Sequence, residues 1–331
     1  MPRKEPFHLH LESFRKRPAL FHVTEDHWQA AAKRHPALAR RIRVTFGWDG
    51  DVLDTALKTA DAMINSNPPK ERLHERAPRL KWIQTTGAGI DSLLPLNWLP
   101  ADVALTNNTG AHGAKAEDSC LMAISLLNAR LPQLLAHQRN HVWNSIYTTP
   151  VAGKTVVVIG FGDLGQGAGR AAKKLGAKVI AVTRSGKAAR PADAAYPVTR
   201  IDSVLPKADI VVVTTPLTPE TRNLLNRRRL DLLKPEAGII NIGRSPVVDY
   251  EALREKLVKG ELAGAVLDVF QPEPLPADSP YWDTPNLIVL PHVSCDDPRY
   301  IEHLLDFWFE NFQRLLAGKR LVNMVDRSLG Y

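Results

Sequence analysis

Residues 155–170, "TVVVIGFGDLGQGAGR", carry the pattern that decides the fold of this chain. A run of β-branched residues leads into Gly160, Gly162 and Gly165, and a segment of small residues follows. In a strand–turn–helix unit the first glycine permits a tight turn, the second lets the backbone approach a pyrophosphate, and the third lets the helix pack on the strand. Phosphates are favoured at the helix N-terminus, where free N–H groups and the helix dipole attract anions. We therefore predict a dinucleotide-binding unit at this stretch.

The alternation of strands and helices continues on both sides of this stretch. Apolar strands are predicted in the second part of the chain over residues 155–162, 177–183, 208–216, 237–243, 264–270 and 286–294. Further strands are predicted in the N-terminal third over residues 7–13, 41–48, 60–67, 80–89 and 103–108. Apolar strands that alternate with helices indicate parallel sheets covered by helices on both faces. The predicted fold class is α/β, with two doubly wound parallel-sheet domains.

Helical patterns lie between and after the two series of strands. In the N-terminal third they cover residues 24–35 and 51–60. Residues 115–142 are predicted to be helical with a break or kink at Pro132, because a proline ring removes a backbone donor and clashes with the preceding turn. Residues 296–318 are predicted to form one amphipathic helix.

Length and composition limit the class of protein. A chain of 331 residues can hold two domains, and 44% apolar with 24% charged residues is ordinary globular usage. The first twenty residues are interrupted by charge, unlike a signal peptide, and no run approaches the ~20 apolar residues of a membrane span. Cys120 and Cys295 are the only cysteines, so there is neither a disulfide framework nor a zinc spacing. This suits a reducing cytoplasm and predicts no metal site.

The net charge of +8 comes from lysines and arginines that are scattered along the chain, often beside acids. The densest cluster, "NRRRL" at residues 226–230, is typical of a helix start. A solvated basic surface, with some charge serving an anionic substrate and cofactor, explains this balance better than nucleic-acid binding does. We predict neither a nucleic-acid partner nor a membrane partner.

Arg184 follows the second strand of the dinucleotide-binding unit, 19 residues after Gly165. This is the position that meets the ribose 2′-hydroxyl, where an acid would accept a hydrogen bond and repel a 2′-phosphate. An arginine can pair with that phosphate instead, so we predict NADPH in preference to NADH. Ser185 could donate a hydrogen bond to the phosphate, and Lys187 could add positive charge. The alternative is an exposed loop arginine that stacks on adenine without selecting the phosphate.

Three later strand ends carry polar residues that form a set. Arg244 lies in "IINIGRSPVVDYEAL", Glu273 in "GAVLDVFQPEPLP" and His292 in "LIVLPHVSCDDP". In this form and order the segments resemble those of the D-isomer-specific 2-hydroxyacid dehydrogenases, as do the glycine turn and "DIVVVTTPLTPETRNLLN". The resemblance runs from "TTGAGID" at Thr85 to about Pro298, roughly two thirds of the chain.

The resemblance implies a domain organisation. Members of this family have a flavodoxin-like substrate domain and a Rossmann cofactor domain inserted into it. We therefore expect residues 1–115, completed by a C-terminal helix within residues 299–331, to form the substrate-binding domain. Residues 116–298 are expected to form the dinucleotide-binding domain. The family usually dimerises through helices at the domain junction, so a homodimer is expected as well.

The resemblance also implies roles for the three strand-end residues. Reduction of a 2-oxo acid needs a hydride donor, a proton donor for the developing alkoxide and a cation for the carboxylate. Arg244 offers a planar fork that can bind the carboxylate and polarise the adjacent carbonyl. His292 would donate the proton, and Glu273 would hold the imidazole and favour its charged form. Taken singly, each has a plainer interpretation: a surface arginine, a rim carboxylate or a packed histidine.

Other site residues are carried over from the family. The backbone amides of Ala88 and Gly89 are expected to hold the substrate carboxylate, although a simple strand-to-helix turn explains the same glycines. Asp268 matches an acid that contacts the nicotinamide carboxamide, with a helix cap as the alternative. Asn65 and Asn67 are expected to line the cleft. The remaining expected cofactor contacts are Asp163, Leu164, Thr214, Thr215, Pro216 and Ile242.

Arginine followed by serine at positions 184 and 185 resembles the pattern at this place in the NADPH-dependent glyoxylate and hydroxypyruvate reductases of the family. The segments "EPLPADSPYWDTPNLIVLPHVS" and the closing "VDRSLGY" resemble these reductases as well. Ser245 and Cys295 stand where a glycine is usual, which leaves the size of the substrate open. Two alternatives are kept: an NAD-linked dehydrogenase of a larger acid, and a dinucleotide-sensing protein like the C-terminal-binding corepressors, because one fold hosts several functions.

Overall fold

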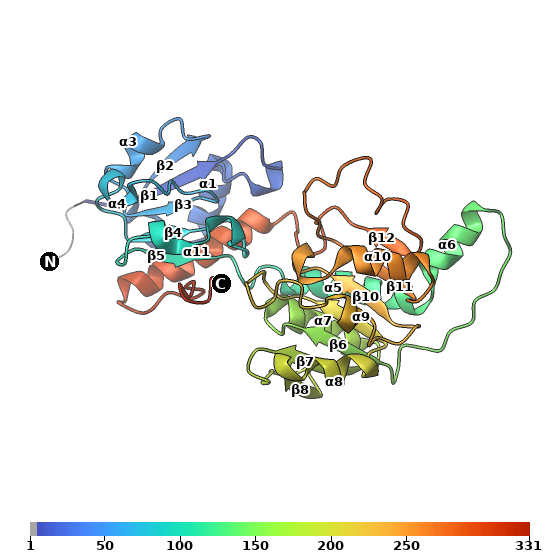
Figure 1. Cartoon of the computed structure of the whole chain (residues 1–331). Coiled ribbons are helices and arrows are strands. Elements are labelled where there is room, and N and C mark those ends of the chain that lie inside the picture. The colour runs from blue at the N-terminus through green and yellow to red at the C-terminus, as the bar shows by residue number, and fades with distance from the viewer. Residues whose placement is uncertain (1–4) are drawn as a thin grey trace. The chain divides into compact units, whose positions relative to one another are not determined.

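The computed structural model describes residues 5–331 and divides the chain into two compact units. One unit consists of the chain up to Ala111 together with Asp297–Tyr331, and the other is His112–Asp296 (Figure 1). Each unit is built around its own parallel sheet. The predicted fold class is therefore confirmed.

The first unit contains a five-stranded sheet in the order β2-β1-β3-β4-β5, with every pair parallel. This is the flavodoxin-like order, in which the chain reverses direction beside β1. The strands are β1 Phe7–Ser13, β2 Ile42–Trp48, β3 Ala62–Ile64, β4 Trp82–Gln84 and β5 Ala104–Thr106. The helices are α1 Glu25–Arg34, α2 Pro36–Ala39, α3 Leu53–Leu57, α4 Leu73–Arg76 and α11 Tyr300–Leu316, with short 3-10 turns at Ala19–Phe21, Asp91–Leu93 and Leu96–Trp98.

The C-terminal helix α11 completes the core of this unit. Leu9 and Leu11 of β1 are fully buried and belong to the same apolar cluster as α1 and α11. Trp308 of α11 stacks on Trp82 of β4 with ring centroids 5.0 Å apart and planes 3° from parallel. The predicted amphipathic helix is thus confirmed, because its apolar face closes a core that the N-terminal residues leave open on one side.

The other face of β1 buries polar side chains. His8, His10 and Glu12 are each at most 1% exposed. His10 Nε2 lies 2.9 Å from Glu12 Oε2, while His8 Nε2 and His10 Nδ1 each lie 2.9 Å from Thr45 Oγ1 on β2. These bonds compensate for the loss of water around buried polar groups. Burial, followed by the charge of Arg43, lowers the pKa of His8 from its ordinary value.

The second unit contains a seven-stranded parallel sheet in the order β12-β11-β10-β9-β6-β7-β8. Counted from β6, this is the Rossmann order with one more strand at the edge. The strands are β6 Thr155–Ile159, β7 Lys178–Thr183, β8 Ala194–Pro197, β9 Ile210–Val213, β10 Gly238–Asn241, β11 Gly264–Leu267 and β12 Leu287–Val289. The helices are α5 Gly113–Asn128, α6 Leu131–Arg139, α7 Asp163–Lys174, α8 Ile201–Val204, α9 Arg227–Leu230 and α10 Tyr250–Val258, with 3-10 turns at Val198–Arg200, Leu205–Lys207 and Ser245–Val247.

The long helical stretch of this unit is broken as predicted. Helix α5 ends at Asn128, Arg130 takes a left-handed conformation, and α6 starts with Pro132 in its first turn. The two helices are bent by 64°. Among the described residues no single helix is long and apolar enough to cross a membrane. Helices α5 and α6, taken together as a bent pair, have the length and the composition for a span. After α6 the chain forms a loop that runs along the outside of its unit before β6 begins (Figure 1).

Candidate active site

The glycine turn lies between β6 and α7 and has the shape that its sequence predicts. Gly160 has a φ of +86°, and a Cβ there would lie 2.9 Å from Thr215 Cγ2. A Cβ at Gly165 would overlap the carbonyl group of Gly160. Side chains are therefore excluded at both positions, by conformation at the first and by contact at the second.

Gly162 differs from the other two glycines of the turn, because a Cβ there would meet no protein atom within 4 Å. The backbone at the start of α7 is therefore open to an approaching group. Thr215 Oγ1 is buried and has no hydrogen-bond partner among the described residues, and the same is true of Asp163 Oδ2. An open backbone at a helix N-terminus, beside the Thr215 hydroxyl that can donate, fits the pyrophosphate of a dinucleotide. The Asp163 carboxylate only accepts hydrogen bonds, so its side chain does not bind the phosphates.

The rest of the predicted cofactor residues surround this turn. Thr214 Oγ1 donates to the carbonyl oxygen of Gly160 at 2.9 Å, so it holds the turn itself. Ile242 follows β10 and is buried, Leu164 is half-buried in α7, and Pro216 is exposed after β9. All of these positions lie at the carboxyl ends of neighbouring strands or at the start of α7, where doubly wound sheets bind their ligands.

The turn after β7 presents the predicted basic residues. Thr183 Oγ1 donates to the carbonyl oxygen of Lys187 at 2.9 Å, and Ser185 Oγ accepts from the backbone N–H of Lys187 at 3.3 Å. Arg184, Ser185 and Lys187 are exposed. The pKa of Glu220 is lowered chiefly by a hydrogen bond with Thr218, and the charge of Arg184 adds to the effect. A cationic turn thus closes the second strand of the dinucleotide unit.

Arg244 is held at the end of β10 by a buried asparagine. Asn241 Nδ2 donates to the carbonyl oxygen of Arg244 at 3.1 Å and to Tyr250 Oη at 2.9 Å. Asn241 Oδ1 accepts the backbone N–H of Gly243 at 3.0 Å. The guanidinium of Arg244 donates to the carbonyl oxygen of Gly243 at 2.8 Å. Sequence reasoning missed Asn241 and Tyr250, although an asparagine that ends the apolar strand "GIIN" is a visible signal.

His292 and Glu273 form a hydrogen-bonded pair. His292 Nδ1 lies 2.8 Å from Glu273 Oε2, and Glu273 Oε1 accepts the backbone N–H of Phe270 at 2.8 Å. An ionised carboxylate only accepts, so Nδ1 carries the proton of this bond. Nε2, on the other side of the ring, is the nitrogen that can face a substrate. The His292 side chain is 49% exposed, which leaves room for that contact.

Asp268 follows β11 and is 1% exposed. Its Oδ1 accepts the backbone N–H of Val293 at 2.8 Å and that of Ser294 at 3.2 Å, and its Oδ2 accepts the Ser294 N–H at 3.1 Å. Burial raises the pKa of the Asp268 carboxyl, and these N–H groups oppose that effect. The carboxylate therefore contacts the residues directly after His292.

The expected substrate loop follows β4 in the first unit. Thr85 Oγ1 donates to the carbonyl oxygen of Gly87 at 2.8 Å, and the backbone N–H of Asn108 donates to the same oxygen at 3.1 Å. Ala88 is half-buried and Gly89 is exposed. The loop is thus anchored at its first glycine, and its next two residues lie towards the surface.

A cation that the sequence did not single out lies beside this loop. Arg17 Nη1 donates to Thr86 Oγ1 at 3.1 Å, and its guanidinium lies 4.6 Å from the ring centroid of Phe21. Arg17 comes from the segment after β1, far from the loop in sequence, so only the fold reveals this contact.

Asn65 and Asn67 have different surroundings. Asn65 is fully buried, and its Oδ1 accepts the backbone N–H of Asn67 at 2.7 Å. Its Nδ2 is buried without a hydrogen-bond partner among the described residues. Asn67 is exposed. Asn65 therefore shapes the turn after β3, and Asn67 is the one of the two that reaches the surface.

The structure gathers the three predicted catalytic residues in one unit. Arg244, Glu273 and His292 follow β10, β11 and β12, which are neighbours in the sheet. Ala88, Gly89, Asn65 and Asn67 belong to the other unit. Among residues 5–331, no group of three or more His, Cys, Asp or Glu side chains is placed to hold a metal ion.

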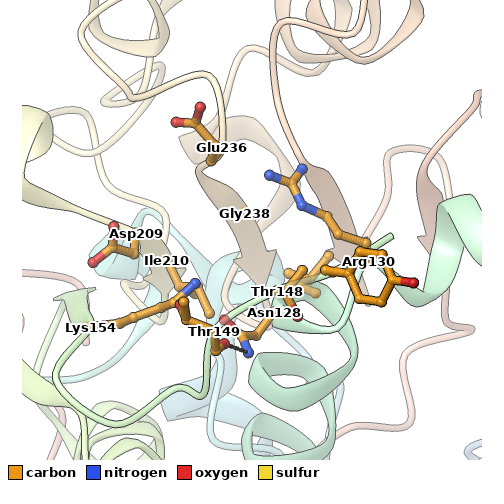
Figure 2. A pocket seen from close by; sticks show the side chains of 11 residues that line it. Asn128, Arg130, Thr148, Thr149, Lys154, Asp209, Ile210, Glu236 and Gly238 are labelled. Atoms are coloured by element: carbon orange, nitrogen blue, oxygen red, sulfur yellow. Dashed lines mark hydrogen bonds between the residues drawn. The ribbon is translucent and has the colours of Figure 1, made fainter. Parts of the chain in front are cut away.

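A cavity of about 200 Å³ lies at the opposite ends of the strands of the second unit. Its lining includes Ile210 and Gly238, the first residues of β9 and β10. Figure 2 shows the cations of Arg130 and Lys154 and the carboxylate of Asp209 around it. Because doubly wound folds bind ligands at the carboxyl ends of their strands, this cavity is separate from the candidate active site.

Comparison with known proteins gives a consistent result. The family model described as D-isomer specific 2-hydroxyacid dehydrogenase, NAD binding domain, matches residues 121–294. Glyoxylate/hydroxypyruvate reductase B of Pectobacterium carotovorum subsp. carotovorum is 32% identical over 247 residues, which cover 72% of this chain and 77% of that protein. D-3-phosphoglycerate dehydrogenase of Mycobacterium bovis is 30% identical over 289 residues, which cover 86% of this chain but 54% of that protein.

A solved structure is similar over nearly the whole chain. The NADPH-dependent glyoxylate/hydroxypyruvate reductase of Sinorhizobium meliloti, crystallised in complex with NADP and sulfate, is 27% identical. It aligns with a TM-score of 0.80 over 98% of this chain and 99% of that one.

Proposed function

Because the chain belongs to the D-isomer-specific 2-hydroxyacid dehydrogenase family, we propose that it reduces a small 2-oxo acid to the D-2-hydroxy acid with NADPH. The proposed substrates are of the glyoxylate and hydroxypyruvate type. The observation that carries the proposal is the Glu273–His292 pair, which follows β11 and β12 in the sheet where Arg244 follows β10. A carboxylate, an imidazole and a guanidinium at one sheet edge suit the reduction of a keto acid.

The proposed chemistry assigns one task to each residue. NADPH, when bound, supplies the hydride that reduces the carbonyl carbon. His292 gives a proton from Nε2 to the oxygen on which negative charge develops. Glu273 accepts from Nδ1 throughout, so it keeps the ring oriented with Nε2 towards the substrate. The guanidinium of Arg244 binds the substrate carboxylate and draws electron density from the neighbouring carbonyl.

The cofactor would be held by the glycine turn and by the basic turn after β7. Gly162 leaves the backbone open for the pyrophosphate, and the exposed Arg184, Ser185 and Lys187 would bind a 2′-phosphate. The likeness to a reductase crystallised with NADP supports NADPH as the preferred cofactor. NADH is the less preferred donor in this proposal.

The test is an assay of reduced-cofactor oxidation, with NADPH and NADH in parallel and glyoxylate, hydroxypyruvate, pyruvate and a bulky 2-oxo acid as substrates. Fast oxidation of NADPH with the two small polar acids is expected. Turnover of the bulky acid alone would contradict the proposed substrate class. Tight cofactor binding without turnover of any acid would favour a dinucleotide-sensing protein.

A second candidate is an NAD-linked dehydrogenase of a larger or phosphorylated acid. The observation that favours it is the 30% identity to a D-3-phosphoglycerate dehydrogenase, of which this chain spans about half. Adding 3-phosphoglycerate with NAD to the same assay separates the two candidates. Oxidation of that acid at a higher rate than glyoxylate reduction would select the second one.

We further propose that the protein acts as a homodimer in the cytoplasm. Trp143 and Tyr147, in the loop after α6, are almost fully exposed in the single chain. Large exposed aromatic side chains are typical of surfaces that bind a partner. The free thiols of Cys120 and Cys295 agree with a reducing compartment.

A further inference from the structure

The backbone at His292 is strained. Its φ is +56°, a left-handed conformation that is uncommon for residues other than glycine. Such a conformation persists where the surrounding structure imposes it, and it is often found in active sites. The segment after His292 therefore needs anchors that outweigh the strain.

The first anchor is Asp268, at the end of the neighbouring strand β11. Both of its carboxylate oxygens accept backbone N–H groups, from Val293 and Ser294, at 2.8 to 3.2 Å. The carboxylate is almost completely buried, and burial raises its pKa. A charged group costs free energy in such a place unless it is well bonded. The bonds that it makes fix the two residues that follow the proposed proton donor.

The second anchor is the start of helix α5. Ser119 Oγ donates to the carbonyl oxygen of Ser294 at 2.7 Å, and His112 Nδ1 lies 3.0 Å from the carbonyl oxygen of Cys295. The N–H groups of the segment are thus held from β11 and its carbonyl groups from α5. A segment bonded on both sides has little freedom to relax.

We propose that Asp268 is a positioning residue that imposes the left-handed conformation of His292, and that Ser119 assists it from α5. This rests on the proposed role of His292 as proton donor. In the anchored segment the imidazole meets Glu273 at 2.8 Å, and Nε2 takes a fixed direction. Proton transfer depends steeply on such alignment, so the anchors act on the rate of turnover.

The alternative role of Asp268 is a contact with the nicotinamide carboxamide, and the two roles predict different effects of a substitution. Loss of that contact would weaken cofactor binding, whereas loss of positioning would lower kcat and leave the cofactor affinity unchanged. The two roles also differ in the absence of cofactor, because only positioning affects the exchange of the Val293 and Ser294 amide hydrogens in the free enzyme.

The experiment uses Asp268→Asn and Ser119→Ala in the full chain. An asparagine at 268 keeps one oxygen acceptor but turns an NH2 group towards the N–H of Ser294, where it repels. We measure kcat and KM with glyoxylate, the Kd of NADPH, and hydrogen–deuterium exchange of the peptide that contains residues 290–296. For Asp268→Asn we expect kcat to fall roughly 100-fold, the Kd of NADPH to stay unchanged and exchange to accelerate. Ser119→Ala should change the same quantities in the same direction, but less.

Asp209→Asn serves as the matched control. Asp209 Oδ2 accepts the backbone N–H of Thr155 at 2.7 Å, and Oδ1 binds Lys234 at 2.8 Å, at the other end of the sheet. Like Asp268→Asn, this variant replaces a carboxylate that accepts a backbone N–H group. It therefore shows how much such a loss affects turnover when the carboxylate lies far from His292. We expect its kcat to match that of the wild type.

Each outcome decides the proposal. A raised Kd for NADPH with unchanged exchange in Asp268→Asn would overturn positioning and favour the cofactor contact. A wild-type kcat in Asp268→Asn, while His292→Gln is inactive, would overturn positioning and leave the proposed function intact. Wild-type turnover in His292→Gln would overturn the proposed function itself. If Asp268→Asn does not fold, Ser119→Ala decides, because unchanged kcat and unchanged exchange in that variant overturn the proposal.

Discussion

Among single residues, His292 carries the proposed proton transfer. Replacement by glutamine keeps a polar side chain of similar size but removes the acid. We expect kcat to fall about 100- to 10,000-fold, the usual contribution of a positioned acid, with the Kd of NADPH nearly unchanged. Steady-state kinetics and a cofactor titration measure the two quantities. His303→Gln, on the exposed side of α11, is the control. Wild-type turnover in His292→Gln would remove the proton-donor role.

Arg184 is the residue that carries the proposed cofactor preference. In Arg184→Asp a negative charge replaces the fork that would pair with the 2′-phosphate. A charge-assisted hydrogen bond contributes about 1.5–3 kcal/mol, so we expect kcat/KM with NADPH to fall by roughly 10- to 100-fold or more. Use of NADH should change far less. Parallel kinetics with both cofactors test this, with Lys178→Ala at the start of the same strand as control. An equal loss with both cofactors would contradict the assignment.

At the residue scale, the sequence alone was sufficient to identify a candidate site residue where the residues that act together lie in one short segment. The glycine turn and the segments around Arg244 and His292 could be identified without a structure. Arg17 could not, because it contacts Thr86, which only the fold brings near. Asn241 was missed although it lies three residues before Arg244 and ends an apolar strand. Asp268 lies between these cases, since its segment could be recognised but its contact with Val293 and Ser294 is visible only in three dimensions.

At the scale of elements, the β6–turn–α7 unit allows a matched pair of variants. Gly165→Ala would push a methyl group into the carbonyl group of Gly160, so we expect both a lower melting temperature and weaker NADPH binding. Gly162→Ala would place its methyl group in open space, at a φ of −75° that any residue adopts. We expect its Tm to stay within a few degrees of the wild type, because exposed substitutions change stability little.

The two variants then differ in what they report. Gly162→Ala should still bind NADPH more weakly, because its methyl group occupies the approach to the backbone. Thermal unfolding without cofactor and NADPH titration separate the two effects. Unchanged NADPH affinity in Gly162→Ala would show that the pyrophosphate does not approach this position.

Elements with a strong apolar pattern were predicted correctly, including three-residue strands such as β3 and β12, and elements without such a pattern were missed. The apolar strands of the second unit and the amphipathic helix α11 were found because their burial pattern is repeated over many residues. Strand β8, "AAYP", was missed because its four residues are only half-buried and resemble a loop. The break before α6 was predicted because proline has a local mechanism that acts whatever the surroundings.

At the scale of the whole molecule, the buried His8 makes the stability depend on pH. The pKa of His8 is lowered in the folded state, by burial and then by Arg43. As pH falls through the ordinary value of about 6.5, the unfolded chain takes up a proton that folded His8 refuses. Stability is therefore lost as pH falls towards the lower, folded-state pKa. The other groups that face His8 are His10, Asp61 and Thr59, of which the last two favour protonation.

The measurement is urea unfolding of the wild type and of His8→Gln at about pH 7.5 and about pH 5.5, on either side of the ordinary histidine pKa. We expect the free energy of unfolding to fall more between these values in the wild type than in the variant. His27→Gln, at the exposed start of α1, is the control. An equal fall in all three proteins would show that other groups carry the pH dependence.

The sequences of the two units differ in how much they indicate about function. The family model matches residues 121–294, which lie entirely within the second unit, and the proposed chemistry lies there too. The first unit supplies the expected substrate contacts, yet its N-terminal residues resemble the family least. Its fold was predictable from alternating apolar segments. Its substrate preference was not, because side chains on loops decide specificity and loops carry no repeating pattern.

The proposed homodimer is a property of the whole molecule as well. In the loop after α6, the Trp143 side chain is fully exposed and the Tyr147 side chain is 93% exposed. In the proposed dimer a second copy of the chain covers this apolar surface. Light scattering after size exclusion should give about twice the 36.7 kDa of one chain. Trp143→Ser should shift the equilibrium towards the monomer, because aromatic anchors contribute about 2 kcal/mol or more to an interface. Trp282→Ser, also in an exposed loop, should leave the mass unchanged. A single-chain mass for the wild type would mean that the loop serves another partner or none.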